Sequence, residues 1–220
     1  MKKSTIYIFY LALFSLVFSP LAAQEILTAV EFFDQVSEKY EYIQDYEADV
    51  IITQPENVLA GILFYKNPGR LRINFEEPAD QVIVSDGRLL TVYLPSQSVT
   101  LNQDLTRGSG EPQGLRLFKQ GYSIAYQETP DYVPLDENSS EEVIKLNLVW
   151  RTTDEGFRQI EMAVGRNGLI RRLKGITKDF DEIQIDLENI KINQSIPDAR
   201  FEYESPPSSY VINNFIFPDE

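Results

Sequence analysis

Four short hydrophobic runs between residues 61 and 93 constrain the fold of this chain more than any other feature. Turn-forming residues separate the runs, namely Asn67-Pro68-Gly69, Glu77-Pro78 and Asp86-Gly87. Proline fixes φ, glycine supplies positive φ, and Asp-Gly favours a tight hairpin turn. The segment therefore predicts an antiparallel meander of four strands.

The second strand of the meander has one apolar side. Leu71, Ile73 and Phe75 alternate with two arginines and an asparagine. Side chains of one parity share a face of a strand, so we expect these three residues to point inward together. A one-residue error in register would exchange inward and outward side chains.

Alternation of apolar and polar residues predicts further strands on both sides of the meander. These strands cover residues 46–54, 98–101, 144–150, 159–164, 169–177 and 183–192, and residues 58–66 contain the first run of the meander. Within the strand 183–192 the apolar residues change from odd to even positions, which predicts a β-bulge near Glu188 and Asn189. Residues 131–142 are polar and acidic, and we expect them to form a loop.

One amphipathic helix is expected before the first strand, from residue 29 to residue 43. Thr28 and Glu31 fit a capping box. Apolar residues follow at helical spacing, at Val30, Phe33, Val36 and Tyr40. Because no internal repeat or low-complexity linker divides the chain, the sequence predicts a mainly β protein with few helices. We expect one domain, a curved antiparallel half β-barrel of about ten or eleven strands with helices covering its mouth.

The N-terminal segment, residues 1–23, has the pattern of a secretory signal peptide. Two lysines precede an apolar run at residues 6–18, and a region of small residues follows at residues 19–23. We expect export and cleavage after Ala23, which leaves residues 24–220 as the folded domain. A retained N-terminal anchor helix is the alternative, although the apolar run is short for a membrane span.

The chain is strongly acidic. Its net charge is −14, and loss of the two lysines of the predicted signal peptide makes it −16. This charge disfavours nucleic acid and anionic lipid headgroups as partners, and it favours a monomer even when a protein carries an apolar cavity.

The sequence contains no histidine and no cysteine, which removes the usual general base, the usual nucleophile pairs, and thiolate or imidazole metal ligands. Residues 179–182 lack the spacing and the glycine of a calcium loop. Gly108-Ser109-Gly110 is followed by Pro112 rather than by a phosphate-binding helix. We therefore expect no enzyme, no catalytic residue, no metal and no cofactor. A hydrolase that uses Glu76 or Glu77 is the least favoured alternative, because adjacent strand residues point to opposite faces.

A glycine-rich segment lies between the meander and the C-terminal strands. Residues 107–112 contain two glycines and a proline, and residues 114–121 form a short helix-capable run with Leu115, Leu117 and Phe118. A brief amphipathic helix on such a hinge can move over a cavity. A surface helix that closes the end of the barrel permanently is the alternative.

This order of elements resembles the periplasmic outer-membrane lipoprotein carriers, the LolA-like proteins. Their pattern is a Gly-led strand ending in Lys-x-Pro, a strand of alternating arginines and hydrophobic residues, a proline, a hydrophobic strand ending in Ser-Asp-Gly, and a strand ending in an aromatic residue. The matching positions here are Gly61, Lys66, Pro68, residues 71–75, Pro78, residues 82–84, Ser85-Asp86-Gly87 and Tyr93. Residues 201–203, followed by Pro206-Pro207 and residues 210–212, resemble the family's closing element, a short aromatic strand before a proline-rich tail.

The resemblance implies a periplasmic carrier of acylated lipoproteins. Such a carrier would accept its cargo from an inner-membrane lipoprotein-releasing ABC transporter and pass it to an outer-membrane acceptor, either a receptor or the membrane itself. In carriers of this family, a segment that corresponds to residues 114–121 forms part of a lid over the cavity. The acyl-chain-binding residues expected on this basis are Leu71, Ile73, Phe75, Val50, Ile52, Ile62 and Phe64, with Leu115 and Phe118 from the lid.

One position departs from the family pattern. Carriers often have an arginine immediately before the strand-ending proline, where it bonds to the lid, and this chain has Asn67 there. Either Asn67 makes a shorter bond or a different lid latch exists. The alternative function is a half-barrel lipid-binding or envelope-stress sensing protein with phospholipid or glycolipid cargo.

Overall fold

A computed structural model describes residues 27–105, 115–151 and 157–215 of the chain. Its two described α-helices are α2, Ala29–Tyr42, and α3, Arg116–Gly121. The predicted signal peptide and the predicted hinge at residues 107–112 lie outside the described residues. Among the described helices, none is long and apolar enough to cross a membrane.

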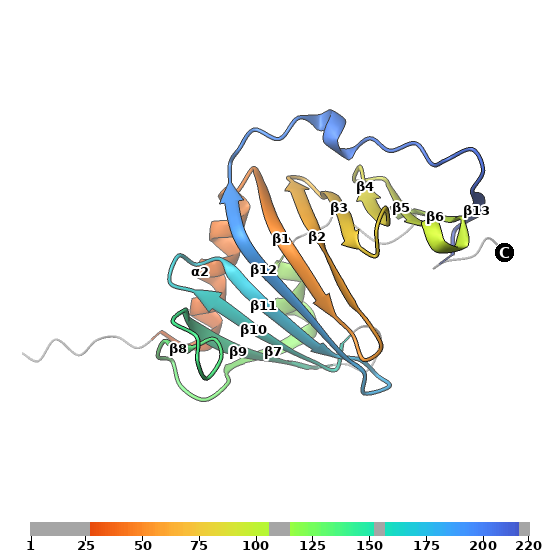
Figure 1. Ribbon diagram of the computed structural model, residues 1–220. Helices are drawn as coiled ribbons and strands as arrows, with labels where there is room; N and C mark the ends of the chain where they lie inside the picture. The colour runs from red at the N-terminus through yellow and green to blue at the C-terminus, as the bar shows by residue number, and fades with distance from the viewer. Residues whose placement is uncertain (1–26, 106–114, 152–156, 216–220) are drawn as a thin grey trace, which may run out of the picture.

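The strands form one curved sheet (Figure 1). Their bounds are β1 Asp45–Thr53, β2 Val58–Lys66, β3 Arg70–Glu77, β4 Val82–Ser85, β5 Leu89–Leu94, β6 Val99–Asp104, β7 Tyr122–Tyr126, β8 Val133–Pro134, β9 Glu142–Trp150, β10 Gln159–Gly165, β11 Ile170–Ile176, β12 Glu182–Ile192 and β13 Tyr210–Asn213. The strand order is β13-β6-β5-β4-β3-β2-β1-β12-β11-β10-β9-β7, and β8 pairs with β9. The pairing of β13 with β6 is parallel, whereas the other described pairings are antiparallel.

The predicted mainly β fold with an open, curved sheet is confirmed, but the sheet has thirteen strands rather than ten or eleven. The prediction did not include β7 or β8, and β8 is only two residues long within the expected loop. The strand predicted at residues 201–203 is wrong. Phe201 instead ends a short 3₁₀ helix, η3, Asp198–Phe201.

Helix α2 begins with the predicted capping box. The Glu31 backbone N–H donates to Thr28 Oγ1 at 3.2 Å, and the Thr28 backbone N–H donates to Glu31 Oε2 at 2.8 Å. Phe33 and Val36 are buried as expected, whereas Val30 is exposed because the buried stripe passes through Phe32 instead.

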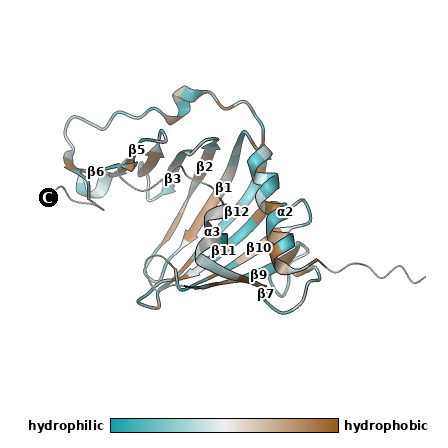
Figure 2. Ribbon diagram, turned by 180° about the vertical axis from the view of Figure 1, so that it is seen from behind, coloured by the Kyte–Doolittle hydropathy of each residue, from teal (hydrophilic) through white to brown (hydrophobic). Residues whose placement is uncertain are grey.

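The buried stripe of α2 packs on one face of the sheet, which we call the inner face. Both helices lie on this side, over the β7–β11 half (Figure 2). The cluster beneath them is formed by apolar residues of α2 and of strands β9, β10 and β11. Its buried members are Ala29, Phe32, Phe33, Val36, Ile144, Leu146, Leu148, Ile160, Met162, Val164 and Ile170.

The opposite, outer face carries the segment between β12 and β13, residues 193–209, which we call the C-terminal strap. In Figure 1 it runs from the end of β12 along the upper rim of the sheet to β13. Asp45 is only 3% exposed and accepts hydrogen bonds from the backbone N–H groups of Gln194 and Ile196, at 2.7 and 3.2 Å. A buried carboxylate satisfied by backbone donors fixes the start of the strap.

Basic side chains on the outer face of β2 and β3 hold the next part of the strap. Lys66 Nζ and Arg70 Nη1 lie 2.6 and 2.7 Å from Asp198 Oδ1, and these bonds lower the pKa of Asp198. Arg72 Nη1 donates to two carbonyl oxygens of the strap at 3.0 and 3.1 Å. The alternating basic residues of β3 therefore bind the chain's own C-terminal segment.

The described sheet has three register shifts. In one of them, Ala163 pairs with Arg172 and Val164 pairs with Ile170, so β11 has one extra residue. The other two lie in β12 and β3. Glu47 pairs with Lys191 but Asp49 pairs with Glu188, so β12 has one extra residue there, as predicted. Asn189 adopts a positive φ of 50° at this bulge.

The bulge in β3 lies opposite Gly61. Ala60 pairs with Glu77 while Gly61 pairs with Phe75, which leaves Glu76 as the extra residue. A Cβ at position 61 would lie 2.2 Å from the Asn74 carbonyl oxygen and 2.8 Å from Phe75 Cα. Only glycine fits this close approach of two backbones.

This contact predicts that Gly61→Ala destabilises the fold by about 3 kcal/mol or more, because two backbone segments must separate. Urea unfolding followed by circular dichroism measures the effect. Gly121→Ala is the matched control, since no atom lies within 4 Å of a Cβ there, and it should change stability by no more than about 0.5 kcal/mol. Equal stability of the two variants would contradict the close approach.

Candidate functional site

The inner face is wider than the helices that lie on it. Twelve strands follow one another across the sheet, and at roughly 4.8 Å between neighbours they span about 53 Å. An α-helix with its side chains is only about 10–12 Å in diameter. The two described helices therefore close the β7–β11 half and leave the other half of the inner face without a helical layer.

The half without a helical layer has an apolar surface that we call the apolar floor. It is contributed by β1, β2, β3 and β12, and its buried members are Ala48, Val50, Leu63, Ile73, Phe75 and Leu187. Leu173 of the helix-covered cluster pairs directly with Ile185, which packs against the floor, so the two halves share one face.

Half-buried apolar side chains surround the floor. They are Tyr46, Ile52, Leu59, Tyr65, Leu71, Ile83, Ile185 and Ile190. Five of the predicted acyl-chain-binding residues belong to the floor or to this margin, namely Val50, Ile52, Leu71, Ile73 and Phe75. The structure thus brings together residues from separate predicted strands, and their role in ligand binding stays a prediction.

Two other predicted residues, Ile62 and Phe64, do not join them, and their placement on the inner face is wrong. Phe64 pairs with Arg72, and it is buried on the outer face against Ile196 and Phe201 of the strap. The cause is strand β2, in which both parities are apolar, so that alternation does not reveal its inward side. The inward residues of β2 that the prediction missed are Leu59, Leu63 and Tyr65.

The predicted lid residues Leu115 and Phe118 pack against the helix-covered cluster rather than against the floor. Helix α3 is joined to α2 by an ion pair, with Lys119 Nζ 2.6 Å from Asp34 Oδ1. Asn67 is exposed at the β2–β3 turn, where its backbone N–H donates to the Gln44 carbonyl oxygen at 2.8 Å. The ion pair Lys119–Asp34 thus connects α3 to α2, whereas the backbone N–H of Asn67 bonds to Gln44.

Three tyrosines connect the helix-covered cluster to the floor. Tyr40 packs against the cluster, and Tyr46 and Tyr65 pack against the floor. Tyr40 and Tyr46 meet edge to face at 6.3 Å, and Tyr46 stacks on Tyr65 at 5.1 Å. The Ile170 backbone N–H donates to the Tyr40 hydroxyl oxygen at 2.9 Å. Burial raises the pKa of Tyr40 to about 12 and also raises the pKa of Tyr46. Both phenols are therefore neutral at physiological pH and close the end of the floor with apolar rings.

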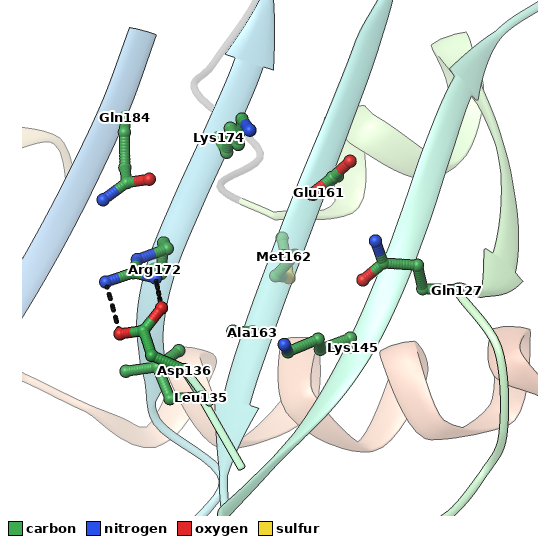
Figure 3. A pocket seen from close by; sticks show the side chains of 10 residues that line it. All are labelled: Gln127, Leu135, Asp136, Lys145, Glu161, Met162, Ala163, Arg172, Lys174 and Gln184. Atoms are coloured by element: carbon green, nitrogen blue, oxygen red, sulfur yellow. Dashed lines mark hydrogen bonds and ion pairs between the residues drawn. The ribbon is translucent and has the colours of Figure 1, made fainter. Parts of the chain in front are cut away.

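A polar pocket of about 240 Å³ lies on the outer face of β9–β12, under residues 127–136 (Figure 3). Two of its basic side chains, Arg172 and Lys174, form ion pairs. Arg172 forms ion pairs with Asp136, at 2.7 Å, and with Asp186, and the Arg172 hydrogen bond lowers the pKa of Asp136. Lys174 Nζ lies 3.0 Å from Glu182 Oε1. The Arg172–Asp136 ion pair thus joins the loop at residues 127–136 to β11, and these paired charges offer little to a ligand.

The described residues contain no group of three or more acidic side chains that could hold a metal ion. Glu76 and Glu77 are exposed at the end of β3. The apolar floor and its half-buried margin contain five of the residues predicted to bind acyl chains, and this role stays a prediction.

Comparisons with known proteins agree with this architecture. A family model described as outer membrane lipoprotein carrier protein LolA matches residues 52–204. The outer-membrane lipoprotein carrier protein of Pseudomonas putida KT2440 is 26% identical over 159 residues, which are 70% of this chain and 71% of that protein. The carrier of Bordetella avium is 24% identical over 161 residues, 73% of each chain.

Solved structures share the fold at low identity. An uncharacterized conserved protein from Thermus thermophilus has a TM-score of 0.56 at 14% identity, covering 84% of this chain and 98% of that one. The MucA/MucB complex of Pseudomonas aeruginosa has a matching chain with a TM-score of 0.51 at 11% identity, covering 84% and 63%. These likenesses show the fold alone.

The raised pKa of Tyr40 predicts a loss of stability at alkaline pH. An unfolded tyrosine titrates near about 10, so the unfolded state ionises first and the contribution of Tyr40 falls as the pH rises from about 10 to 12. Tyr40→Phe should be slightly less stable than the wild type at about pH 8, because the Ile170 N–H loses its acceptor. Between about pH 8 and 11 it should lose roughly 1 kcal/mol less than the wild type. Urea unfolding at both pH values tests this, and equal losses would contradict it.

The Lys119–Asp34 pair predicts a weak, salt-sensitive attachment of α3. Both side chains are nearly half exposed, so the pair should contribute less than about 1 kcal/mol. Lys119→Met should speed amide hydrogen exchange in α3 a few-fold, and high salt should do the same to the wild type. Lys191→Met, which removes the exposed pair with Glu47 on the sheet, is the control and should leave α3 unchanged. Unchanged exchange in Lys119→Met would show that another contact holds α3.

Proposed function

The chain belongs to the LolA family of outer-membrane lipoprotein carrier proteins, and from that premise we propose that it is a lipid-binding carrier whose apolar floor receives acyl chains. The expectation of a non-catalytic protein agrees with this family, whose members carry ligands rather than transform them. The proposal names acylated lipoproteins as cargo.

One observation carries the proposal, namely an apolar floor that is surrounded by half-buried apolar side chains and that includes no residue of the two described helices. Burial of each methylene of an acyl chain contributes about 0.8 kcal/mol, so even part of one chain binds usefully without hydrogen bonds. The half-buried side chains at the margin, among them Leu59, Leu71 and Ile185, would lose water when the chain lies on them. Reversible binding follows from such contacts, because they lack directional bonds.

The remaining steps of the proposed cycle follow from the family. The protein would be exported by its N-terminal signal peptide and act as a monomer in the periplasm. It would take lipoproteins from an inner-membrane lipoprotein-releasing ABC transporter and deliver them to an outer-membrane acceptor. Without the two lysines of the signal peptide, its net charge of −14 becomes −16, which disfavours binding of the protein surface itself to anionic headgroups.

The binding surface predicts different effects for two neighbouring substitutions in β2. Leu59 packs against the floor, whereas Val58 lies on the outer face with 53% of its surface exposed. Leu59→Asn should weaken the affinity for a fluorescent long-chain fatty acid about tenfold, because a polar amide replaces an apolar contact. Val58→Asn is the matched control and should bind as the wild type does. No saturable binding by the wild type would overturn the lipid-binding role itself.

The carrier role needs a second measurement. The purified protein is incubated with spheroplasts of an envelope that makes acylated lipoproteins, and the soluble fraction is probed for lipoprotein bound to it. Released lipoprotein supports the carrier. Stably bound phospholipid or glycolipid without lipoprotein supports the alternative, a half-barrel lipid-binding or envelope-stress sensing protein.

A further inference from the structure

The end of the sheet at β13 is almost free of charged side chains. Residues 89–103 and residues 205–215 contain no aspartate, glutamate, lysine or arginine, although 25% of the chain is charged. These two segments supply β5, β13 and all of β6 except Asp104, and the three strands are neighbours at one end of the sheet (Figure 1). Proteins that avoid association commonly place charges on such an edge. The β13 edge lacks this protection, which is typical of an edge that another chain contacts.

Apolar side chains of β13 are exposed on both faces of the sheet. Directly opposed residues share a face, so the face of Ile212 follows from the register that leads to Ile73 of the floor. The connecting residues are Ile83, Val92 and Leu101. Ile212 and Tyr210, 38% and 71% exposed, therefore lie on the inner face, and Val211, 45% exposed, lies on the outer face. A strand added beyond β13 would cover apolar side chains on both sides.

The backbone of β13 presents hydrogen-bonding groups on its outward side. Toward β6, the Tyr210 backbone N–H donates to the Ser98 carbonyl oxygen at 2.8 Å. Each side of a strand uses every second residue, so the N–H and C=O groups of Val211 and Asn213 point away from β6. No described strand pairs with these groups. Alternating donors and acceptors at this spacing fit another extended polypeptide backbone.

The available edge is short and has a defined limit at each end. Pro206 and Pro207 precede it and have no N–H to donate. Asn214 follows it with a φ of 54°, outside the extended region. The strand between them, β13, has four residues. Such an edge accepts one short strand and does not support open-ended aggregation.

The charge and length of the edge restrict its partner. Two copies of a chain with a net charge of −14 repel each other. A four-residue strand also buries far less than the roughly 1,200 Å² of a stable protein interface. An uncharged edge has no complement for a strongly basic or acidic segment. The edge therefore fits a short, uncharged and extended segment of a different protein, one that is held to this chain by a further contact.

We propose that β13 binds an uncharged segment of the lipoprotein cargo's own polypeptide as an added strand. This inference rests on the proposed function, because the acyl chains of the cargo supply the further contact. It extends that function from the lipid to the protein part of the cargo. Backbone pairing selects for conformation and lack of charge rather than for one sequence, so different lipoproteins can use the same edge.

The distance between the floor and β13 sets which part of the cargo can reach the edge. Four strand intervals separate β3 from β13, and at roughly 4.8 Å each they span about 19 Å. An extended chain covers this distance in about six residues. Acyl chains held on the floor would keep the following polypeptide near β13 at an effective concentration of about 1 mM, so that weak pairing is sufficient.

Val211→Pro tests the added strand, because it removes an outward N–H and leaves the bonds to β6 in place. The probe is a palmitoylated peptide in which six glycine and serine residues precede the uncharged segment Thr-Val-Thr-Val-Thr. Val211→Pro should bind this lipopeptide about tenfold more weakly than the wild type and should bind a long-chain fatty acid equally well. Val211→Thr, which keeps the N–H and the branched shape, is the matched control and should change both affinities less than about twofold.

Hydrogen exchange of the full-length protein locates the contact. Binding of the lipopeptide should slow exchange of the Val211 and Asn213 amides about tenfold, whereas the Tyr210 amide is already bonded to β6. Slow exchange at Tyr210 in Val211→Pro shows that β13 stays in place. A lipopeptide N-methylated at alternate residues of its final segment should bind the wild type about tenfold more weakly than the plain one, which repeats the test without a protein variant.

The outcomes separate this inference from the proposed function. Equal affinities of Val211→Pro and the wild type for the lipopeptide, or of the plain and N-methylated lipopeptides for the wild type, would overturn the inference. Protection of Val211 and Asn213 that grows with protein concentration in the absence of lipopeptide would also overturn it, because a second copy would then occupy the edge. In each case, binding of the fatty acid leaves the proposed function intact. Failure to bind the fatty acid would overturn the proposed function itself.

Discussion

The structure depends on the difference in width between one curved sheet and the two described helices that pack on its inner face. An apolar sheet face must be covered by another layer or by a ligand. Helix α2 satisfies this requirement for β9, β10 and β11, where the largest cluster of fully buried side chains lies. The floor on β1, β2, β3 and β12 carries the same kind of side chain, and neither described helix contributes a residue to it. Curvature brings those side chains together, and the bulges in β3 and β12 supply part of that curvature.

The two faces of the sheet contact different parts of the chain. On the outer face, the strap satisfies Asp45 and the basic residues of β2 and β3, and it buries Phe64 beneath Ile196 and Phe201. The strap thus adds stabilising contacts on the outer face, while the cluster beneath α2 stabilises the inner face over β9, β10 and β11. On the inner face, half-buried apolar side chains surround the floor, and no residue of the two described helices belongs to it.

The sequence predicted those parts of the fold in which one parity of a strand is clearly apolar. Leu71, Ile73 and Phe75 alternate with charged or polar residues, and the structure places all three together on the inner face. In β12 the apolar residues change from odd to even positions, and this change predicted the bulge for the same reason. Strand β2 gave no such signal, because Ile62 and Phe64 are as apolar as the residues of the other parity. Their outward position depends on the strap, more than one hundred residues later in the chain.

Contacts between residues far apart in the sequence account for other features of the structure that the sequence did not predict. The attachment of α3 uses Lys119 and Asp34, 85 residues apart, and nothing local to either residue marks the pair. Gly61 was informative only as the first residue of a family pattern, whereas its physical reason is the bulge that it faces across the sheet. Short elements such as β8 have too few residues to produce any periodicity.

The parallel pairing of β13 with β6 has a consequence for how the molecule is made. Asn213 bonds to Asn102, 111 positions earlier, so β6 has no partner on that side while the intervening chain is still being synthesised. During this interval the nascent protein presents a bare strand edge of the kind that recruits a second polypeptide. β13 can therefore pair with β6 only after the rest of the chain has been made. Proteolytic trimming of the C-terminus would return the finished molecule to that aggregation-prone condition.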